Sequence, residues 1–423
     1  MRKALRIAAA AALVGLSLGA VTAAPTRLPA AHAAPKLTLQ LWYHAYGEAG
    51  THEAVLRYAK EYEQKTGVAV NVTWVLGQGA YDPKLSTALL GSNGPDVFEG
   101  SPTLQMVKAG QVATLDDLLT PEVRKDFDPR SLQVDMIKGH TYGVQMIIDT
   151  GFLYYRKSLF QKAGIKNGPT TFSELMADAK KLNAHGVKGL FVGNDQGVTA
   201  LGGLLVNSAG VNLLNDAGNK VTFDSPRTVQ AMQALRDLNK SGLLLLGSPQ
   251  DWWDPSAFTQ GLAAMQWCGL WAMPGVRKAV GNDFGVVAWP ALDAKGTPAT
   301  FFGGWHEMVN GHGKHIAESK ALLKWMWIEN RTLQADWSTA YGFHIPPRKS
   351  AVAQATKLET GQAADAVTNM GKYARLTPNT WDNAMNTAFN DMVGKVVKTG
   401  DPIAPLVHQA AVKAQTELDR ELK

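Results

Sequence analysis

From residue 36 onward the sequence alternates short strand patterns with amphipathic helix patterns, and this alternation limits the possible folds more than any other feature. Residues 36–42 alternate polar and apolar side chains, as a strand with one buried face does. Residues 52–65 place apolar side chains at helical spacing, and residues 68–75 form a second strand pattern. This order predicts an α/β domain with a mainly parallel sheet, whose ligands bind at the carboxyl ends of the strands.

The rhythm changes where two apolar strand patterns follow each other directly. Residues 144–148 and 151–155 are apolar runs joined by only two residues, which is typical of a chain that crosses from one lobe to another. A second α/β unit is expected beyond them, with helices at residues 171–185, 225–240 and 254–260 and strands at residues 187–192 and 262–267.

Residues 1–34 have the order of segments found in a secretory signal peptide. Basic residues at positions 2, 3 and 6 precede an apolar run at residues 7–21 that is too short to span a bilayer. Small residues near positions 23 and 33 provide two cleavage sites, and we expect cleavage near residue 33 or 34. The sequence therefore predicts an exported protein, either periplasmic or secreted.

The only cysteine, Cys268, lies far from this cleavage site. A lipoprotein needs a cysteine directly after its signal, so we expect a soluble protein without a lipid anchor. A single cysteine also excludes an internal disulfide, so the hydrophobic core alone must stabilise the exported chain. The roughly 390 remaining residues exceed what one core usually supports, and two domains are expected.

The charge of the chain argues against nucleic acid or a membrane surface as a partner. The net charge of +6 falls to about +2 when the basic residues of the predicted signal peptide are removed. The ten histidines are scattered without metal-ligand spacing, so no metal ion or other cofactor is expected. A monomer is expected.

Several stretches together resemble one family, the carbohydrate-type extracellular solute-binding proteins of bacterial ABC importers, which are relatives of maltodextrin-binding protein. The resemblance rests on WYH at residues 42–44, GPDVF at 94–98, GFLYYRKSLF at 151–160, AFTQGLAAM at 257–265, GLW at 269–271, FGG at 302–304 and YGFHIPPR at 341–348. Two positions depart from the family pattern. A proline usual before the LYY run is absent at residues 144–146, and Arg156 stands where Asn is common.

The resemblance implies a two-lobed periplasmic-binding-protein fold of type II, with a mainly parallel sheet flanked by helices in each lobe. The implied first lobe comprises residues 35–148 plus 304–345, and the second comprises residues 149–303 plus 346–423. Three hinge crossings are expected, near residues 148–151, 302–305 and 344–347. The implied function is capture of a sugar, expected to be a maltodextrin-like di- or oligosaccharide, in the cleft between the lobes. The protein would deliver it to the membrane permease subunits of an ABC importer, with no enzyme activity.

Tryptophans supply candidate stacking surfaces for a sugar, because the C–H face of a pyranose packs on a flat ring. Trp271 matches the family position at which a second-lobe aromatic stacks on the ligand. Trp305 follows Gly304, which allows close backbone approach, but it could also pack at the hinge. The remaining candidates are Trp42, Trp381 and the pair Trp252 and Trp253, and this pair could instead dock the transporter. Core positions are expected for Trp74, Trp289, Trp325, Trp327 and Trp337.

Polar ligand contacts are expected from loops that follow strands. His44 and Tyr46 come just after the first strand, and Glu99 directly follows the PDVF strand. Asp149, at the first crossing, aligns with a family carboxylate that binds sugar. Two further candidates, His344 and Arg348, lie near the third hinge crossing. Each could donate a hydrogen bond to a sugar hydroxyl group or could serve only the hinge.

Other functions remain open. A polyol or glycerol phosphate could replace the sugar as the ligand. A glycoside hydrolase would need two carboxylates across a scissile bond, and the linear sequence identifies no such pair. A sensor that presents its ligand to a membrane receptor would use the same fold.

Overall fold

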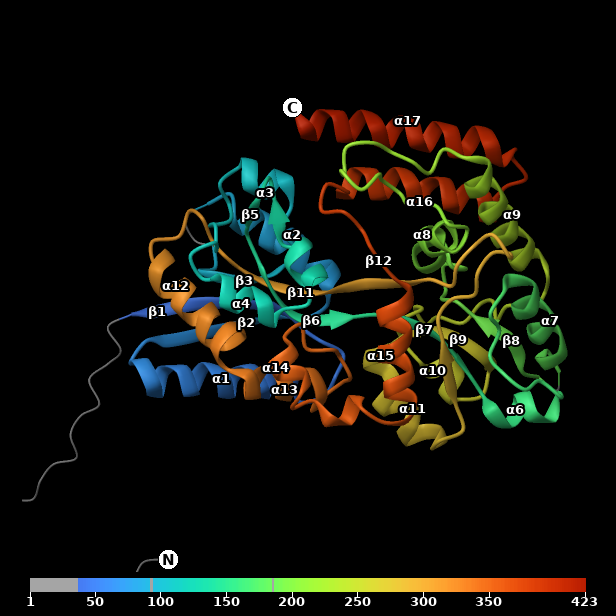
Figure 1. Ribbon diagram of the computed structural model, residues 1–423, viewed down its shortest axis with the longest axis horizontal. Helices are drawn as coiled ribbons and strands as arrows, with labels where there is room; N and C mark the ends of the chain where they lie inside the picture. The colour runs from blue at the N-terminus through green and yellow to red at the C-terminus, as the bar shows by residue number, and fades with distance from the viewer. Residues whose placement is uncertain (1–36, 92–93, 185) are drawn as a thin grey trace, which may run out of the picture.

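The computed structural model describes residues 37–91, 94–184 and 186–423. The predicted signal peptide lies outside these residues. Figure 1 shows two lobes side by side, each with a sheet and flanking helices, joined by strands that run between them. No helix in the described ranges is both long and apolar enough to cross a membrane.

The larger sheet builds the first lobe, and its last strand extends beyond the hinge towards the second lobe (Figure 1). Its strand order is β12 (Ala374–Leu376), β11 (Thr300–Val309), β3 (Val97–Gly100), β1 (Thr38–His44) and β2 (Ala69–Val75), and β6 (Val144–Asp149) also pairs with β11. β1 runs parallel to β2 and β3, whereas β11 runs antiparallel to β3 and β6. The alternation predicted for β1 is real, since Leu39, Leu41 and Tyr43 are fully buried.

The helices of this lobe pack apolar faces against the sheet. α1 (Thr51–Thr66) buries Ala54, Val55, Tyr58 and Tyr62 at helical spacing and ends at Gly67, whose φ of 75° forms a left-handed cap. Other elements here are α2 (Gln78–Ala88), α3 (Leu104–Lys108), α4 (Pro121–Asp126), α5 (Pro129–Gln133), the β4 (Met136–Ile137) and β5 (His140–Thr141) hairpin, α12 (Ile316–Leu323), the π-helical turn η2 (Lys324–Glu329) and α13 (Arg331–Thr339).

The second lobe has a four-stranded sheet of order β10 (Gly285–Val287), β7 (Gly151–Tyr155), β9 (Ala263–Gly269) and β8 (Lys188–Phe191). Only the β8–β9 pair is parallel. The sheets of both lobes are therefore mixed. Parallel pairs predominate in the first lobe, as the sequence predicted, whereas antiparallel pairs predominate in the second. β7 pairs with β9 and β10, which follow it only after long intervening segments, so its direction relative to them depends on connections that no local pattern records.

Helices cover both faces of this second sheet (Figure 1). α7 (Phe172–Leu182) begins with a capping box between Thr171 and Glu174, as its start predicted. The others are α6 (Lys157–Lys162), α8 (Val198–Ser208), α9 (Pro226–Lys240), α10 (Ser256–Thr259), η1 (Leu270–Ala272), α11 (Met273–Val280), η3 (Thr356–Leu358), α15 (Gly361–Tyr373), α16 (Asn383–Lys398) and α17 (Ile403–Leu422). The short helix α14 (Lys349–Val352) instead packs against α13 of the first lobe (Figure 1).

The three expected crossings between the lobes lie side by side. Gly303 pairs with Asp149, and the backbone N–H groups of Ile148 and Ile345 each donate to the other's carbonyl, at 2.8 and 3.0 Å. Gly304 has a φ of 130°, and a Cβ atom there would lie 2.0 Å from the carbonyl oxygen of Ile147. Only glycine fits this contact, so the close packing of the crossings depends on Gly304.

Candidate ligand-binding cleft

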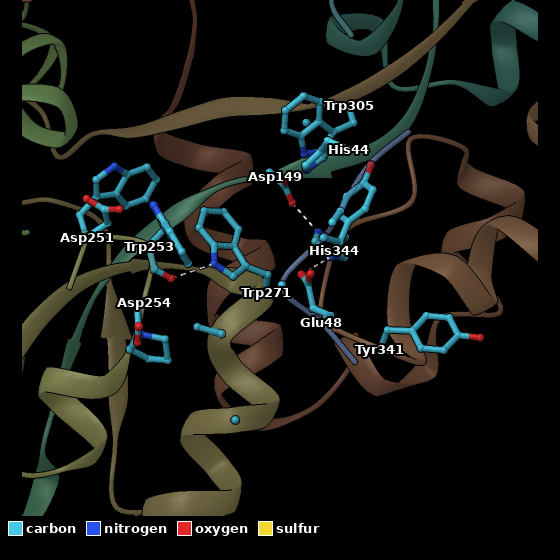
Figure 2. Close-up of a pocket in the computed structure, with 18 of the residues that line it drawn as sticks. His44, Glu48, Asp149, Asp251, Trp253, Asp254, Trp271, Trp305, Tyr341 and His344 are labelled. Carbon is cyan, nitrogen blue, oxygen red and sulfur yellow. Dashed lines mark hydrogen bonds and ion pairs between the residues drawn. The ribbon is translucent and has the colours of Figure 1, made fainter. Parts of the chain in front are cut away.

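A cavity of about 1030 Å³ lies between the two lobes. Its first-lobe and hinge side is lined mainly by the turn after β1, by Asp149, by Trp305 and by the segment that contains Tyr341 and His344. Its second-lobe side is lined by residues 251–255 and by the start of α11. Figure 2 shows the labelled second-lobe residues Asp251, Trp253 and Asp254 on the left and His44, Glu48 and His344 on the right.

The end of β1 places two rings at the cleft, and a buried carboxylate holds them from behind. The hydroxyl group of Tyr46 donates to Oε1 of Glu99 at 2.6 Å, and Nδ1 of His44 lies 2.9 Å from the same oxygen. Burial raises the pKa of Glu99, although His44 and Tyr46 oppose this shift. Burial lowers the pKa of His44, but the charge of Glu99 and other carboxylates outweighs it and leaves the value raised. Glu99 thus fixes both rings.

The same rings pack against the hinge strand. The His44 ring lies 4.3 Å from the Tyr46 ring and 4.2 Å from the Trp305 ring, measured between centroids. Trp305 follows Gly304 at an irregularity of β11, where the register with β6 shifts. The three rings therefore form one contiguous surface at the hinge side of the cavity.

A histidine between two carboxylates forms the polar part of this side. Nδ1 of His344 lies 2.5 Å from Oδ1 of Asp149, and Nε2 lies 3.2 Å from Oε1 of Glu48. Burial alone would lower the pKa of His344, but Asp149 and Glu48 raise it to about 10. Burial opposes the shift at Glu48, yet the hydrogen bond from His344 lowers the pKa of Glu48. His344 is thus an imidazolium that donates through both nitrogens.

The second-lobe side is built around one backbone carbonyl. The indole N–H of Trp271 and the thiol of Cys268 both donate to the carbonyl oxygen of Trp253, each at 3.2 Å. The Trp271 ring meets the Trp252 ring edge-on at 5.7 Å. A Cβ atom on Gly269 would lie 2.1 Å from the Trp271 ring, so the orientation of this ring depends on glycine at that position.

Two carboxylates flank these rings. Oδ1 of Asp254 accepts a hydrogen bond from the backbone N–H of Ser256 at 2.8 Å, just before α10. Asp251 is exposed, and within the described ranges its carboxylate accepts no hydrogen bond. Asp251 therefore remains available to a ligand.

Nine of the twelve residues predicted to bind ligand line the cavity: His44, Tyr46, Asp149, Trp252, Trp253, Trp271, Gly304, Trp305 and His344. Glu99, Arg348 and Trp381 do not. Glu99 is fully buried beneath the rings, Arg348 pairs with Asp126 at 2.8 Å, and Trp381 packs on Phe223 and Phe389 in the second-lobe core.

The other tryptophans mostly follow expectation. Trp289, Trp325, Trp327 and Trp337 are buried, whereas Trp74 is only partly buried and stacks on His52. Trp42 packs in a small first-lobe cluster beneath Lys84 and does not line the cavity.

The sequence interpretation missed several lining residues: Glu48, Asp251, Asp254, Phe301 and Tyr341. Three of these residues could have been identified from their neighbours in the sequence. Glu48 lies in the turn that holds His44, and the two aspartates directly flank the tryptophan pair. The described residues contain no group of three or more His, Cys, Asp or Glu side chains that could hold a metal ion. The cleft therefore offers aromatic faces and carboxylates to an organic ligand.

Comparisons with known proteins match most of the chain. The family described as "Bacterial extracellular solute-binding protein" matches residues 48–326, about two thirds of the sequence. A "Probable ABC transporter-binding protein" of Deinococcus radiodurans is 29% identical over 48% of this chain, which spans only about half (51%) of that relative.

Two further relatives have named ligands. The "Diacetylchitobiose binding protein DasA" of Streptomyces coelicolor is 26% identical, with 68% of each protein covered. The "sn-glycerol-3-phosphate-binding periplasmic protein UgpB" of Pectobacterium atrosepticum is 28% identical, with 49% of each covered. Among solved structures, maltose-bound MalE3 of T. maritima has the same fold, with a TM-score of 0.77 at 21% identity over 90% of this chain and 99% of that chain.

Proposed function

Because the chain belongs to the bacterial extracellular solute-binding protein family, whose members are transport receptors and not enzymes, we propose that it captures a di- or oligosaccharide and delivers it to an ABC importer. The predicted signal peptide supports export to the periplasm or the cell exterior. The partners would be the sugar and the permease subunits in the membrane. Residues 35–148 plus 304–345 and residues 149–303 plus 346–423 are the lobes that we propose close on the ligand.

One observation carries the proposal: aromatic faces and carboxylates from both lobes line a single cavity. Trp271 can pack on the C–H face of one pyranose, and Trp305 offers a second ring across the cleft. Asp149 and Asp251 can accept hydrogen bonds from hydroxyl groups. A volume of about 1030 Å³ is at the upper end for small-ligand sites, which favours a ligand of two or more sugar units.

The division of the site between lobes explains how binding would be signalled to the importer. Contacts from one lobe exist in any arrangement, but contacts from both exist together only when the cleft is closed. A ligand that touches both sides therefore shifts the population toward the closed form, which the permease would recognise. Closure of this kind is established for periplasmic binding proteins as a class.

Glycerol phosphate is the second candidate ligand, since one relative bears that name. A phosphate is usually bound by Arg, Lys or several free N–H groups. Within the described lining of this cleft there is no Arg or Lys side chain. The geometry therefore favours the sugar.

Calorimetry tests the proposal directly. The protein is unfolded and refolded to remove any copurified ligand, then titrated with mono-, di- and oligosaccharides and with sn-glycerol 3-phosphate. We expect saturable binding of a di- or oligosaccharide, with Kd in the micromolar range or below, and no binding of glycerol phosphate. Preference for glycerol phosphate, or cleavage of the bound sugar into products, would contradict the proposal. Sugar uptake that is normal after deletion of the gene would instead favour a sensor.

A further inference from the structure

The charge of the cleft is unbalanced, and this bears on the chemical class of the sugar. Four carboxylates line it: Glu48, Asp149, Asp251 and Asp254. The described lining contains no Lys or Arg, and its cationic candidates are the two histidines, His44 and His344. His344 already lies between Glu48 and Asp149, and His44 faces the buried Glu99. The carboxylates of Asp251 and Asp254 have no cation opposite them within this lining.

Several hydrogen-bond donors of the lining are engaged within the protein. The hydroxyl group of Tyr46 donates to Glu99, and the indole N–H of Trp271 donates to the carbonyl of Trp253. Both ring nitrogens of His344 face carboxylates. By contrast, Asp149 is buried at the cavity wall and uses only Oδ1 in the bonds that the described residues make. The indole N–H groups of Trp252, Trp253 and Trp305 make no hydrogen bond with the described residues and can also donate to a ligand, but they carry no charge. The negative charge of the carboxylates therefore remains uncompensated on the second-lobe side.

A sugar hydroxyl group can donate a hydrogen bond to a carboxylate, but it carries no charge to balance that of the carboxylate. An ammonium group donates three hydrogen bonds and accepts none, and its charge is attracted both to carboxylates and to the faces of tryptophan rings within about 6 Å. The second-lobe side combines these elements. Asp251 and Asp254 flank the Trp252–Trp253 pair in the sequence, and the Trp271 ring meets the Trp252 ring edge-on. Figure 2 shows Asp251, Trp253, Asp254 and Trp271 together on this side of the cavity.

We propose that the cleft selects an amine-bearing sugar, such as an oligomer of glucosamine, and rejects sugars that carry phosphate or carboxylate groups. This inference rests on the proposed function and specifies its ligand. The ammonium group is bound on the second-lobe side, between the carboxylate of Asp251 and the tryptophan faces. An anionic sugar would meet carboxylates without a compensating cation.

Matched disaccharides separate charge from shape. Calorimetry at pH 6 and low salt compares β-1,4-linked glucosamine disaccharide with its N,N′-diacetyl form and with cellobiose, which differ at the 2-positions as ammonium, acetamide and hydroxyl. A uronic acid disaccharide serves as the anion. We expect the ammonium form to bind about tenfold more tightly than cellobiose, equivalent to ~1.4 kcal/mol. This advantage should shrink in 0.5 M salt, because ions screen the attraction.

A variant that removes one carboxylate charge, with a matched control, tests where the ammonium group binds. Asp251→Asn keeps the shape of the side chain and should lower the ratio of ammonium to cellobiose affinity several-fold. Asp391→Asn, at an exposed position on α16 outside the cavity, should leave that ratio unchanged.

The outcomes for the inference and for the proposed function are distinct. Cellobiose or the diacetyl form binding as tightly as the ammonium form overturns the inference and leaves the sugar receptor intact. Preferred binding of the uronic acid also overturns it. No binding of any sugar, in this panel or in the broader one, overturns both. An Asp251→Asn variant with an unchanged ratio overturns the placement of the ammonium group.

Discussion

The two sides of the cleft are constructed differently. On the first-lobe and hinge side, His44, Tyr46 and Glu99 form one bonded set, and Glu48, His344 and Asp149 form another. On the second-lobe side one backbone carbonyl holds the Trp271 ring, and Trp253 is half exposed.

This difference suggests separate roles in ligand binding for the two sides of the cleft. Groups that are bonded to each other before the ligand arrives lose little conformational entropy on binding, so the first-lobe side can fix the position of the sugar. The loosely held tryptophans contribute contact area and can adjust to the ligand. We therefore expect mutations on the first-lobe side to change folding stability, and those on the second-lobe side to change affinity.

The largest effect is expected for His344→Ala. The substitution leaves the buried Asp149 and the partly buried Glu48 without the cation that lies between them, which should lower the free energy of unfolding by about 3 kcal/mol. Denaturant unfolding followed by circular dichroism measures it. His408→Ala is the control, because His408 pairs with Asp224 at the exposed surface and should contribute less than about 0.5 kcal/mol. Equal effects of the two substitutions would contradict the interpretation.

On the other side, Trp271→Ala should weaken sugar binding by about 2 kcal/mol, as expected for loss of a central aromatic anchor. Titration calorimetry measures the change, and Trp271→Phe should recover part of it. Trp381→Ala removes a tryptophan that does not line the cavity and should leave affinity unchanged. Loss of affinity only in the Trp381 variant would place the site elsewhere.

The stability of the first-lobe side should also depend on pH. His344 has a raised pKa of about 10 in the folded protein, so its stabilising contribution is complete below pH 6.5 and is lost as pH rises through 10. Between pH 8 and 10 the folded histidine keeps a proton that the unfolded one has lost. The free energy of unfolding should therefore fall by up to about 1.4 kcal/mol per pH unit from this group.

Glu307, whose pKa burial raises to about 8, also titrates in the lower part of this pH range, but it contributes equally to the wild type and to a His344 variant. Unfolding curves of the wild type and His344→Gln between pH 8 and 10 make the comparison. A decline of the same slope in both proteins would show that other groups cause it.

The smallest effect is expected for Trp253→Ala. Half of this residue is exposed, and its carbonyl group, which holds Trp271, is retained in the variant. We expect a loss of binding below about 1 kcal/mol, measured by the same titration. A loss as large as that of Trp271→Ala would mean that the side chain of Trp253, and not its backbone, organises this side.

Much of the fold could be predicted because local patterns and tertiary packing agree. The alternation in β1, the buried face of α1 with its glycine end, and the paired apolar runs at the first crossing all matched. Strand direction was less accessible. Whether β7 runs parallel or antiparallel to β9 depends on connections between distant segments, which no local pattern records.

Site residues could be predicted from the sequence where their position at the end of a strand places them at the cleft. They could not be predicted where the direction of the side chain decides whether it reaches the cleft. His44 and Asp149 follow or end strands at the cleft. Glu99 lies in a strand of four residues that is buried on nearly every position, so alternation cannot show which face its carboxylate takes. Arg348 and Trp381 found partners far away in sequence, Asp126 and Phe223.

The thiol of Cys268 provides a reporter of the second-lobe side. It is buried, burial raises its pKa, and it shares the Trp253 carbonyl with Trp271. A protonated, inaccessible thiol does not react with alkylating reagents, so modification requires this region to open. The rate at which the Cys268 thiol is alkylated therefore measures how often the region around Trp253 and Trp271 opens. A ligand that stabilises this region should slow the reaction, and no cysteine has to be introduced for the measurement.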